Sequence, residues 1–597
     1  MANHVPERSE IEARYKWDLT QIYKTVEDWE KALKQVEEQI KAFSAFDGKV
    51  AEDPKAAIKA NYELFRACMP VMFYASREKD LDNTDSAAQG RVARASMLGR
   101  DLHTAAAFLE PELLAMPTEQ LEALAADPEM AEYDAFLREL IIQKPHCLDK
   151  EQEKLIAMMG SVGGAPRNAY SMLTNADMKY PEVVDAEGNT HPLTESLFVS
   201  YLRSQDRQTR KDAFEKLFSA YEGMGNTIAA MYNGSVQNDI FQARSHNYAT
   251  SRAAAMEPLE IPEEVYDNLV QVVHEYIPVL TEYLELRKQV MNLDELHMYD
   301  LYTPLVSDFK FDLSFDKAMD MVLEGLKPMG EDYIEVLKEA RENNWMDVYP
   351  TRAKSSGAYS AGLNGLHPFV LLNHDGTLAN TFTIAHELGH SMHSYYSCAA
   401  QPFAKANYSL FVAEVASTCN EAVMMRHLLT QFTEKKARLY FYNHFLEQFR
   451  TTVFRQTMFA EFELEAHRMA EAGQPLIKQT LSEAYYKLNK EYYGGACNVD
   501  ELIKNEWMRI PHFYRAYYVY VYATGLCAAI SLSEKILSGD PQALADYRKF
   551  LSAGCSVPPI EALKLAGIDM SKPEPLRKAL DVFKATLSDF RKAMEEE

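Results

Sequence analysis

Two histidines and a glutamate in the stretch 381–394, "TFTIAHELGHSMHS", have the types and spacing to hold a metal ion and use it. They are His386, Glu387 and His390, in the pattern H-E-x-x-H. On a helix, His386 and His390 lie one above the other on the same face, so their ring nitrogens can share one tetrahedral Zn²⁺. Glu387 projects roughly 100° around the helix and can reach a water on the metal without binding the metal. The pattern predicts a hydrolytic zinc site, and the alternative is a helix whose two histidines are hydrogen-bonded elsewhere.

A catalytic zinc needs a third protein ligand and an open position. The longer pattern H-E-x-x-H-x-x-G-x-x-H fails, because His393 and Tyr396 occupy its Gly and last His positions. A carboxylate from the helical stretch 408–429 is the other option, and this stretch holds Glu414 and Glu421 on nearly the same face. An acidic side chain in such an apolar stretch is costly unless it is paired or bound to metal. Periodicity leaves open which of the two binds metal, which one holds a ligand histidine, and whether either is an ordinary core ion pair.

A second group of polar side chains follows in the stretch 509–525, "RIPHFYRAYYVYVYATG". His512 is followed there by five tyrosines: Tyr514, Tyr517, Tyr518, Tyr520 and Tyr522. Buried phenol groups need hydrogen-bond partners, so such a density of them is unusual for a core. Histidine and tyrosine can both donate to the oxyanion that forms when a peptide bond is attacked. The alternative is an aromatic core segment, and the alternation of tyrosine and valine leaves helix and strand equally open.

Helices are expected to build most of the fold, because helical periodicity dominates the chain. In 25–43, Trp29, Leu33, Val36 and Ile40 recur at spacings of three and four residues with charges between them. The same periodicity predicts helical structure in three further stretches: 264–291, 540–554 and 573–594.

Strand signals are few. The stretch 177–194 has two short runs around a turn and predicts a hairpin. The apolar run 367–376 directly precedes the metal-binding helix, which is expected to start at Asn380 or Thr381. A strand there could hold an extended peptide along its edge. The Gly- and Ser-rich stretch 355–365 is expected to be a loop.

The chain has 597 residues, a formal net charge of −26 and 47% hydrophobic residues, as in a large globular protein. Because phosphates would be repelled, we expect neither nucleic acid nor an anionic membrane as a partner. No secretory signal is expected from the N-terminal stretch, and no apolar run of about 18 residues predicts a membrane span. The seven cysteines are scattered and never form C-x-x-C pairs, which predicts free thiols and a cytoplasmic location.

The segments that carry these groups resemble oligoendopeptidase F, in the thimet oligopeptidase family of zinc metallopeptidases. The resemblance rests on "GLHPFVLLNHDGTLANTFTIAHELGHSMHS", "LFVAEVASTCNE" and "IPHFYRAYYVYVYATG", and on their order and spacing. The segment "KLIAMMGSVGGAPRNAYSMLTNADMKYPEV" is similar to the N-terminal domain of oligoendopeptidases. This resemblance covers most of the chain.

The resemblance implies one Zn²⁺ per chain, with His386, His390 and Glu414 as its ligands and Glu387 as the general base. Glu421 falls on an acidic position seven residues beyond the third ligand. We expect it to hydrogen-bond a ligand histidine without binding the metal itself.

For the oxyanion, the resemblance implies a pair made by His512 and a nearby tyrosine. The gap between that histidine and the tyrosines is shorter here than in the thimet oligopeptidase branch. Tyr520 is favoured, and Tyr517 comes second.

The fold implied is mostly α, a large helical zincin-type peptidase with a small β-sheet beside the zinc helix and a deep enclosed channel between two halves. An N-terminal helical oligoendopeptidase domain is expected over 1–200 and a catalytic zinc-peptidase domain over 201–597. Such a channel admits short unstructured oligopeptides and excludes folded proteins. We therefore expect a zinc metalloendopeptidase that hydrolyses internal peptide bonds with a zinc-bound water activated by Glu387.

The same residues admit two other functions. A peptide-binding protein with a structural zinc would normally show four protein ligands, and the sequence offers three plausible ones. An exopeptidase that trims dipeptides would need a basic group for a terminal carboxylate. Arg509 or Arg515 could supply it, although an ordinary surface or salt-bridged role is expected for each.

Overall fold

The computed structural model describes residues 5–306 and 313–596, and the chain forms two compact units. Unit 1 is made of three stretches: Met1–Cys147, Lys310–Gln431 and Ala529–Asp569. Unit 2 is made of the other three: Leu148–Phe309, Phe432–Ala528 and Met570–Glu597. Each unit is therefore assembled from segments that are distant in sequence. The division of the chain near residue 200 and the channel between two halves stay predictions.

Unit 1 is mostly helical. Its helices are α1 (Val26–Phe43), α2 (Pro54–Leu81), α3 (Ser86–Ala106), α4 (Leu109–Ala115), α5 (Thr118–Ala125), α6 (Asp134–Gln143), α14 (Phe315–Gly325), α15 (Glu331–Glu342), α16 (Leu378–Ala400), α17 (Leu410–Gln431), α22 (Pro541–Leu551) and α23 (Pro559–Leu565).

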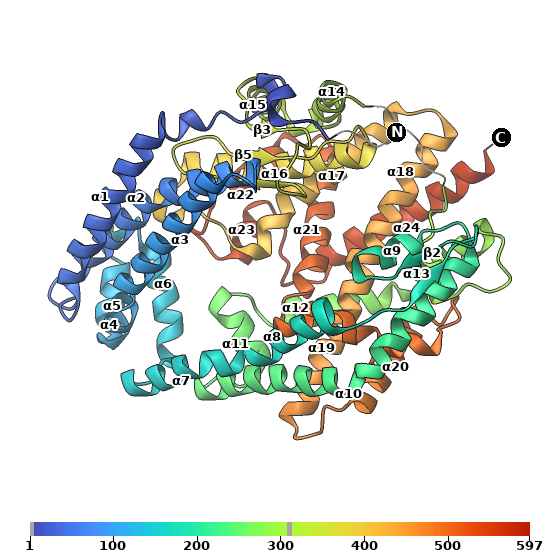
Figure 1. Cartoon of the computed structure of the whole chain (residues 1–597), viewed down its shortest axis with the longest axis horizontal. Helices are drawn as coiled ribbons and strands as arrows, with labels where there is room; N and C mark the ends of the chain where they lie inside the picture. Colours follow the sequence, from blue (N-terminus) through green and yellow to red (C-terminus); the bar gives the residue numbers. More distant parts are fainter. Residues whose placement is uncertain (1–4, 307–312, 597) are drawn as a thin grey trace. The chain divides into compact units, whose positions relative to one another are not determined.

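The predicted helix at 25–43 is confirmed as α1. The side chain of Thr25 caps it by accepting the N–H of Asp28, and its apolar face, including Trp29 and Leu33, is buried. Helices α1, α2 and α3 lie side by side (Figure 1) and share one hydrophobic core.

A three-stranded sheet of unit 1 lies beside α16, as the resemblance implied. Its strand order is β3 (Met346–Asp347), β5 (Phe369–Leu371), β4 (Tyr359–Ala361). The central strand β5 is parallel to β3 and antiparallel to β4, with Val370 opposite Met346 on one side and Ser360 on the other. Both sides of β5 are therefore paired, and all three of its residues are buried.

This strand order corrects two expectations. The strand at 367–376 cannot offer an edge to a peptide, because its neighbours already use its backbone hydrogen-bonding groups on both sides. The edge next to α16 belongs to β4, inside the stretch 355–365 that was expected to be a loop. Glycine and serine have a weak strand propensity, so the sequence of this stretch does not indicate a strand. The backbone hydrogen bonds to β5 stabilise the strand instead.

Unit 2 is helical as well, and the hairpin predicted at 177–194 is confirmed in it, with β1 (Glu182–Val184) antiparallel to β2 (Thr190–Pro192). Its helices are α7 (Lys150–Gly163), α8 (Ala165–Met172), α9 (Glu195–Leu202), α10 (Arg207–Ser245), α11 (Ser251–Met256), α12 (Glu264–Glu275), α13 (Ile277–Val290), α18 (Lys435–Gln448), α19 (Arg455–Glu471), α20 (Lys478–Tyr493) and α24 (Glu574–Glu595). Helix α21 (Tyr520–Leu537) begins among the residues of unit 2 and ends among those of unit 1.

The stretch 264–291 is helical as predicted, but it is broken into α12 and α13 at Tyr276. Pro278 causes the break, because proline lacks a backbone N–H and its ring clashes with the carbonyl four residues earlier in a continuous helix. The predicted helices at 540–554 and 573–594 are confirmed as α22 and α24.

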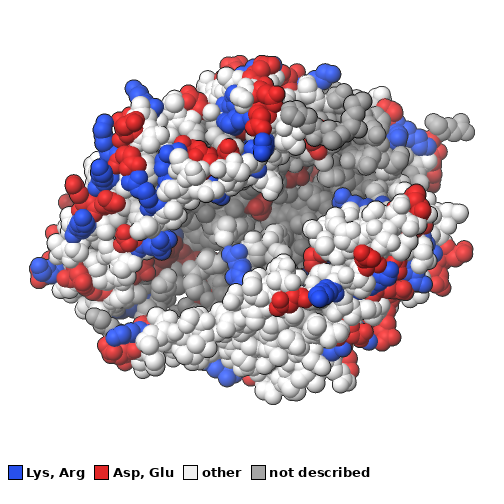
Figure 2. Space-filling model, viewed as in Figure 1, with Lys and Arg blue, Asp and Glu red and all other residues white. Residues whose placement is uncertain are grey.

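Acidic and basic side chains are interspersed over the face shown in Figure 2. Within the described residues, no helix combines the length and the apolar character that crossing a bilayer requires. None of the seven cysteines, which all lie within the described residues, forms a disulfide.

Candidate metal centre and active site

The H-E-x-x-H pattern lies on α16, and this helix starts earlier than predicted. Its cap is Thr377, whose side-chain oxygen accepts the N–H of Asn380 at 3.2 Å. Asn380 and Thr381, the predicted starts, therefore lie within the first turn. Sequence alone does not choose among these three residues, because each has a side chain that can cap a helix.

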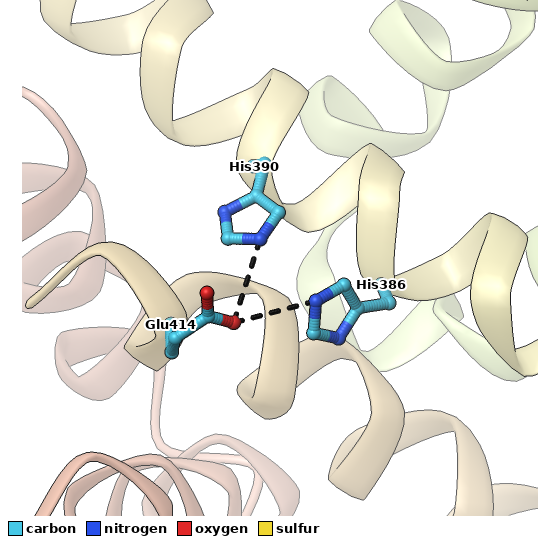
Figure 3. A group of neighbouring side chains, drawn as sticks. All are labelled: His386, His390 and Glu414. Atoms are coloured by element: carbon cyan, nitrogen blue, oxygen red, sulfur yellow. Dashed lines mark ion pairs between the residues drawn. The ribbon is translucent and has the colours of Figure 1, made fainter. Parts of the chain in front are cut away.

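His386 and His390 project from the same face of α16, and Glu414 of α17 points at both of them (Figure 3). The Oε2 atom of Glu414 lies 3.3 Å from Nε2 of His386 and 3.5 Å from Nε2 of His390. The two rings are nearly perpendicular, with their centroids 4.9 Å apart. Two imidazole nitrogens and one carboxylate oxygen thus converge on one point.

Glu421 meets the other side of the His386 ring. Its Oε1 atom lies 2.5 Å from Nδ1 of His386. A carboxylate that accepts the Nδ1 proton leaves Nε2 as a lone-pair donor and fixes the orientation of the ring. The structure therefore groups Glu414 with the two Nε2 atoms and Glu421 with Nδ1, a distinction that helical periodicity left open.

The charges of this cluster are strongly coupled. Burial works against a charged His386 ring, but hydrogen bonds to Glu414 and Glu421 raise its pKa to about 10. Hydrogen bonds from His386 and then from His390 hold the pKa of Glu414 well below its usual range. Two carboxylates facing two imidazoles carry the charge that a divalent cation balances.

Helices α16 and α17 approach each other closely at Gly389. A Cβ atom at this position would lie 2.5 Å from the Cα of Ser417 and 2.8 Å from the carbonyl oxygen of Ala416. Only a residue without a side chain fits there. The close approach brings Glu414 and Glu421 within reach of His386.

Asn420 fixes the same pair of helices through its side-chain amide. Its Nδ2 donates to the carbonyl oxygen of Ala385 at 3.0 Å, and its Oδ1 accepts the hydroxyl of Tyr333 at 2.7 Å. Asn420 is fully buried. Sequence reasoning missed this residue, although an asparagine inside an apolar helical stretch was a signal.

The residues present fit a catalytic zinc ion. The ligand atoms of His386, His390 and Glu414 all lie within 4.8 Å of one another. Two imidazoles and one carboxylate form a typical three-ligand set that leaves the fourth position for water or substrate. The hydrogen bond from His386 to Glu421 supplies the outer partner that metal-binding histidines usually have.

Glu387 is not one of the three residues whose donor atoms converge. Its side chain is largely buried, and the residue is 7% exposed. Burial raises the pKa of Glu387, while the charges of His386 and His390 work in the opposite direction. A carboxylate with a raised pKa is a stronger base than one in water.

The second group of polar side chains lies in unit 2, around the start of α21. A 3₁₀ segment, Pro511–Tyr514, carries His512, and α21 begins at Tyr520. The exposed ring of His512 lies near Tyr522, whose hydroxyl is 3.5 Å from its Nε2. The ring of Tyr518 is parallel to that of His512, with centroids 6.5 Å apart. These three rings form one cluster, which is called the His512 cluster below.

The two tyrosines favoured from the sequence lie elsewhere. Tyr520 is 1% exposed and packs against Tyr266, with ring centroids 5.1 Å apart. Tyr517 is 5% exposed, and its ring packs against His467 at 4.9 Å. The structure therefore brings His512 together with Tyr522 and leaves Tyr520 and Tyr517 in the core of unit 2.

A backbone hydrogen bond anchors the turn between His512 and α21. The N–H of Tyr517 donates to Oε1 of Glu463 on α19 at 2.9 Å. Tyr517 has a positive φ of 51°, a conformation that is uncommon for a residue with a side chain. Glu463 is fully buried, and burial raises its pKa to about 8. Sequence reasoning did not single out this glutamate.

Comparison with known proteins shows the family to which the chain belongs. Residues 200–582, more than half of the chain, match the family model described as "Peptidase family M3". The chain belongs to peptidase family M3. Residues 112–180 of this family M3 peptidase match a second model, described as "Oligopeptidase F".

Several relatives of this family M3 peptidase are similar over nearly their whole length. Oligopeptidase PepF of Bacillus subtilis is 42% identical, over 99% of this chain and 89% of the relative. Group B oligopeptidase PepB of Streptococcus agalactiae is 37% identical, over 98% of each chain. The crystal structure of oligoendopeptidase-F from Enterococcus faecium is 33% identical, covers 96% of this chain and 99% of that one, and has a TM-score of 0.74.

These findings confirm the resemblance to oligoendopeptidase F and the helical fold class. The family M3 peptidase is a metalloendopeptidase.

Proposed function

We propose that this metalloendopeptidase is zinc-dependent and hydrolyses internal bonds of short unstructured oligopeptides. The observation that carries the proposal is the convergence of three donor atoms beside a glutamate that is not among them. A structural zinc site would normally offer a fourth protein ligand, and among the described residues the metal-binding group has three members. A cytoplasmic location stays a prediction from the free cysteines.

His386, His390 and Glu414 would hold the zinc ion, and Glu421 would orient His386. When bound, zinc supplies a Lewis acid that polarises the substrate carbonyl and lowers the pKa of water. Glu387 accepts the proton of the attacking water and then donates it to the nitrogen of the leaving amine. Its burial beside the donor set supports this role, since a desolvated carboxylate is more basic than an exposed one.

His512 and Tyr522 are proposed as the donors that stabilise the oxyanion. An oxyanion donor must reach within about 3 Å of the substrate oxygen, so its polar atom must be accessible. The Tyr522 hydroxyl lies next to the exposed His512 ring, whereas Tyr520 is buried. Partial desolvation of the His512 ring, and then the charge of Arg515, lower its pKa, so near neutral pH the ring is neutral and can donate one N–H.

Strand β4 is proposed to hold the backbone of the substrate. It is an edge strand of the sheet beside α16, and Ser360 on β4 is hydrogen-bonded to Ser391 on α16 at 2.8 Å. An extended peptide can add to such an edge through main-chain hydrogen bonds.

Cleavage of a quenched fluorescent nonapeptide by the wild type and by Glu387→Gln tests the function, with the bound metal counted in both. We expect one zinc per chain in each protein, internal cleavage by the wild type, and a loss of turnover of about 100-fold or more in Glu387→Gln. Near-normal turnover by a folded, zinc-loaded Glu387→Gln would show that Glu387 is not the general base. Release of terminal dipeptides alone would show that the protein acts as an exopeptidase.

A further inference from the structure

Arg515 is joined to the His512 cluster by its backbone and by its side chain. Its N–H donates to the carbonyl oxygen of His512 at 2.9 Å. Its guanidinium carbon lies 3.8 Å from the centroid of the Tyr518 ring. Stacking on an aromatic face orients an arginine and leaves the edge of its guanidinium group available for hydrogen bonds.

The guanidinium group of Arg515 has no carboxylate partner among the described residues, and Arg515 is exposed. The other arginine considered from the sequence, Arg509, differs in this respect. Its Nη2 lies 2.7 Å from Oε2 of Glu195, so its charge is already paired. In a chain with 88 acidic and 62 basic residues, partners for arginine are abundant, and Arg515 is nevertheless held on a tyrosine ring.

We propose that Arg515 is a binding subsite for a carboxylate of the peptide substrate. A guanidinium group presents paired N–H donors that match the two oxygens of a carboxylate, and such charge-assisted bonds are stronger than neutral ones. The ligand is an Asp or Glu side chain, or the C-terminal carboxylate, of an oligopeptide. This subsite rests on the proposed role of His512 and Tyr522 at the scissile bond.

The geometry limits where the carboxylate can sit. The Tyr518 centroid lies 3.8 Å from the Arg515 guanidinium carbon and 6.5 Å from the His512 centroid. The guanidinium group is therefore within about 10 Å of the His512 ring, which an extended peptide spans with about three residues. The preferred carboxylate should lie within about three residues of the cleaved bond.

An aspartate scan of one peptide tests the subsite. Quenched fluorescent nonapeptides with blocked termini carry one Asp, or a matched Asn, at successive positions, and a further pair ends in a free carboxylate or an amide. The proteins are the wild type, Arg515→Gln, Arg515→Lys and Arg100→Gln. Arg100 is an exposed residue of α3 and is not a member of the His512 cluster, so its variant removes the same charge without changing any residue of the cluster. Mass spectrometry locates each cleaved bond.

In the wild type, we expect the KM of an Asp peptide to be lower than the KM of its matched Asn peptide by about fivefold or more when the Asp lies within three residues of the cleaved bond. The kcat values of the two peptides should differ little. Arg515→Gln should lose this preference, Arg515→Lys should keep part of it because it retains the charge without the fork, and Arg100→Gln should keep all of it. Equal Asp preference in the wild type and in folded Arg515→Gln, or no preference in the wild type, would overturn the subsite. A preference for the free C-terminus alone would identify the terminal carboxylate as the ligand.

Binding of the same labelled peptides, followed by fluorescence anisotropy, separates the subsite from the catalytic proposal. A wild type that cleaves no peptide would count against the proposed function. In that case, tighter binding of Asp peptides than of Asn peptides that is lost in Arg515→Gln would still support the subsite, and equal binding would overturn it.

Discussion

At the scale of single residues, exposure separates Tyr522 from Tyr520. Both stand in the same tyrosine-rich stretch, and the sequence favours Tyr520 through resemblance. The structure instead places the Tyr522 hydroxyl 3.5 Å from His512 and buries Tyr520 against Tyr266.

Replacing each tyrosine by phenylalanine tests this difference directly. We expect Tyr522→Phe to lower kcat on the nonapeptide by about 100-fold, because one oxyanion donor is lost. Tyr520→Phe is the matched control and should lower kcat far less. Steady-state kinetics on both variants gives the answer. A larger loss of kcat in Tyr520→Phe than in Tyr522→Phe would support Tyr520, the residue favoured from the sequence, as the oxyanion donor.

The metal-binding residues and the tyrosines differ in how far sequence could predict them. His386 and His390 are four residues apart on one helix, so their geometry follows from helical periodicity alone. The tyrosines follow a turn in which Tyr517 has a positive φ, and the helix that presents Tyr522 begins only at Tyr520. Neither the turn nor the first residue of this helix has a periodic signal, so the accessible tyrosine could not be chosen in advance.

At the scale of elements, the contact between α16 and α17 at Gly389 sets the geometry of the metal centre. We expect Gly389→Ala to lower zinc affinity at least tenfold, because a Cβ 2.5 Å from the Cα of Ser417 must push away the helix that carries Glu414. Overpacking costs about 1–3 kcal/mol, and the helix propensity of alanine offsets about 1 kcal/mol of it. Zinc titration against a chelator and thermal unfolding measure the two effects.

Gly90→Ala in α3 is the matched control, because a Cβ there meets no atom within 4 Å. It should leave zinc affinity unchanged and should not lower the unfolding temperature. Unchanged zinc affinity in Gly389→Ala would show that α17 accommodates the added Cβ atom without displacing Glu414.

Single elements were predictable where one local signal dominates. Thr25 and the apolar stripe of 25–43 specify α1 completely. Pairing between strands is different, because β3, β4 and β5 are short and their order depends on segments that are far apart in sequence. The position of the sheet was implied by resemblance, while its edge could be assigned only from the structure.

At the scale of the whole molecule, the buried Glu463 should make stability depend on pH. Burial raises its pKa to about 8 from an ordinary value of 4.5, and the neighbouring His467 opposes this shift. The folded chain therefore binds a proton between these pH values that the unfolded chain has released. The stability associated with protonated Glu463 is fully present below about pH 4.5 and is lost as the pH rises to about 8.

Glu463→Gln should flatten this pH dependence, because glutamine keeps an oxygen for the Tyr517 N–H but does not titrate. The other charged or titratable groups near the carboxyl are common to both proteins: His467, Asp239, Tyr232, Tyr266, Tyr517 and Tyr520. We expect the unfolding temperature of the wild type to fall by roughly 2 °C or more relative to the variant between pH 5 and pH 8. Parallel curves for the two proteins would show that Glu463 is ionised throughout this range.

The assembly of unit 1 from three distant stretches has a consequence for biosynthesis. Ribosomes extend a chain at about 5–20 residues per second. The helices that carry the metal ligands are finished at Gln431, whereas Phe550, which packs on His393 of α16, belongs to the last stretch of the unit, Ala529–Asp569. The ligands are therefore translated well before the residues that complete the core around them. Until Asp569 has been added, the nascent chain carries an apolar, metal-binding helix whose native neighbours do not yet all exist.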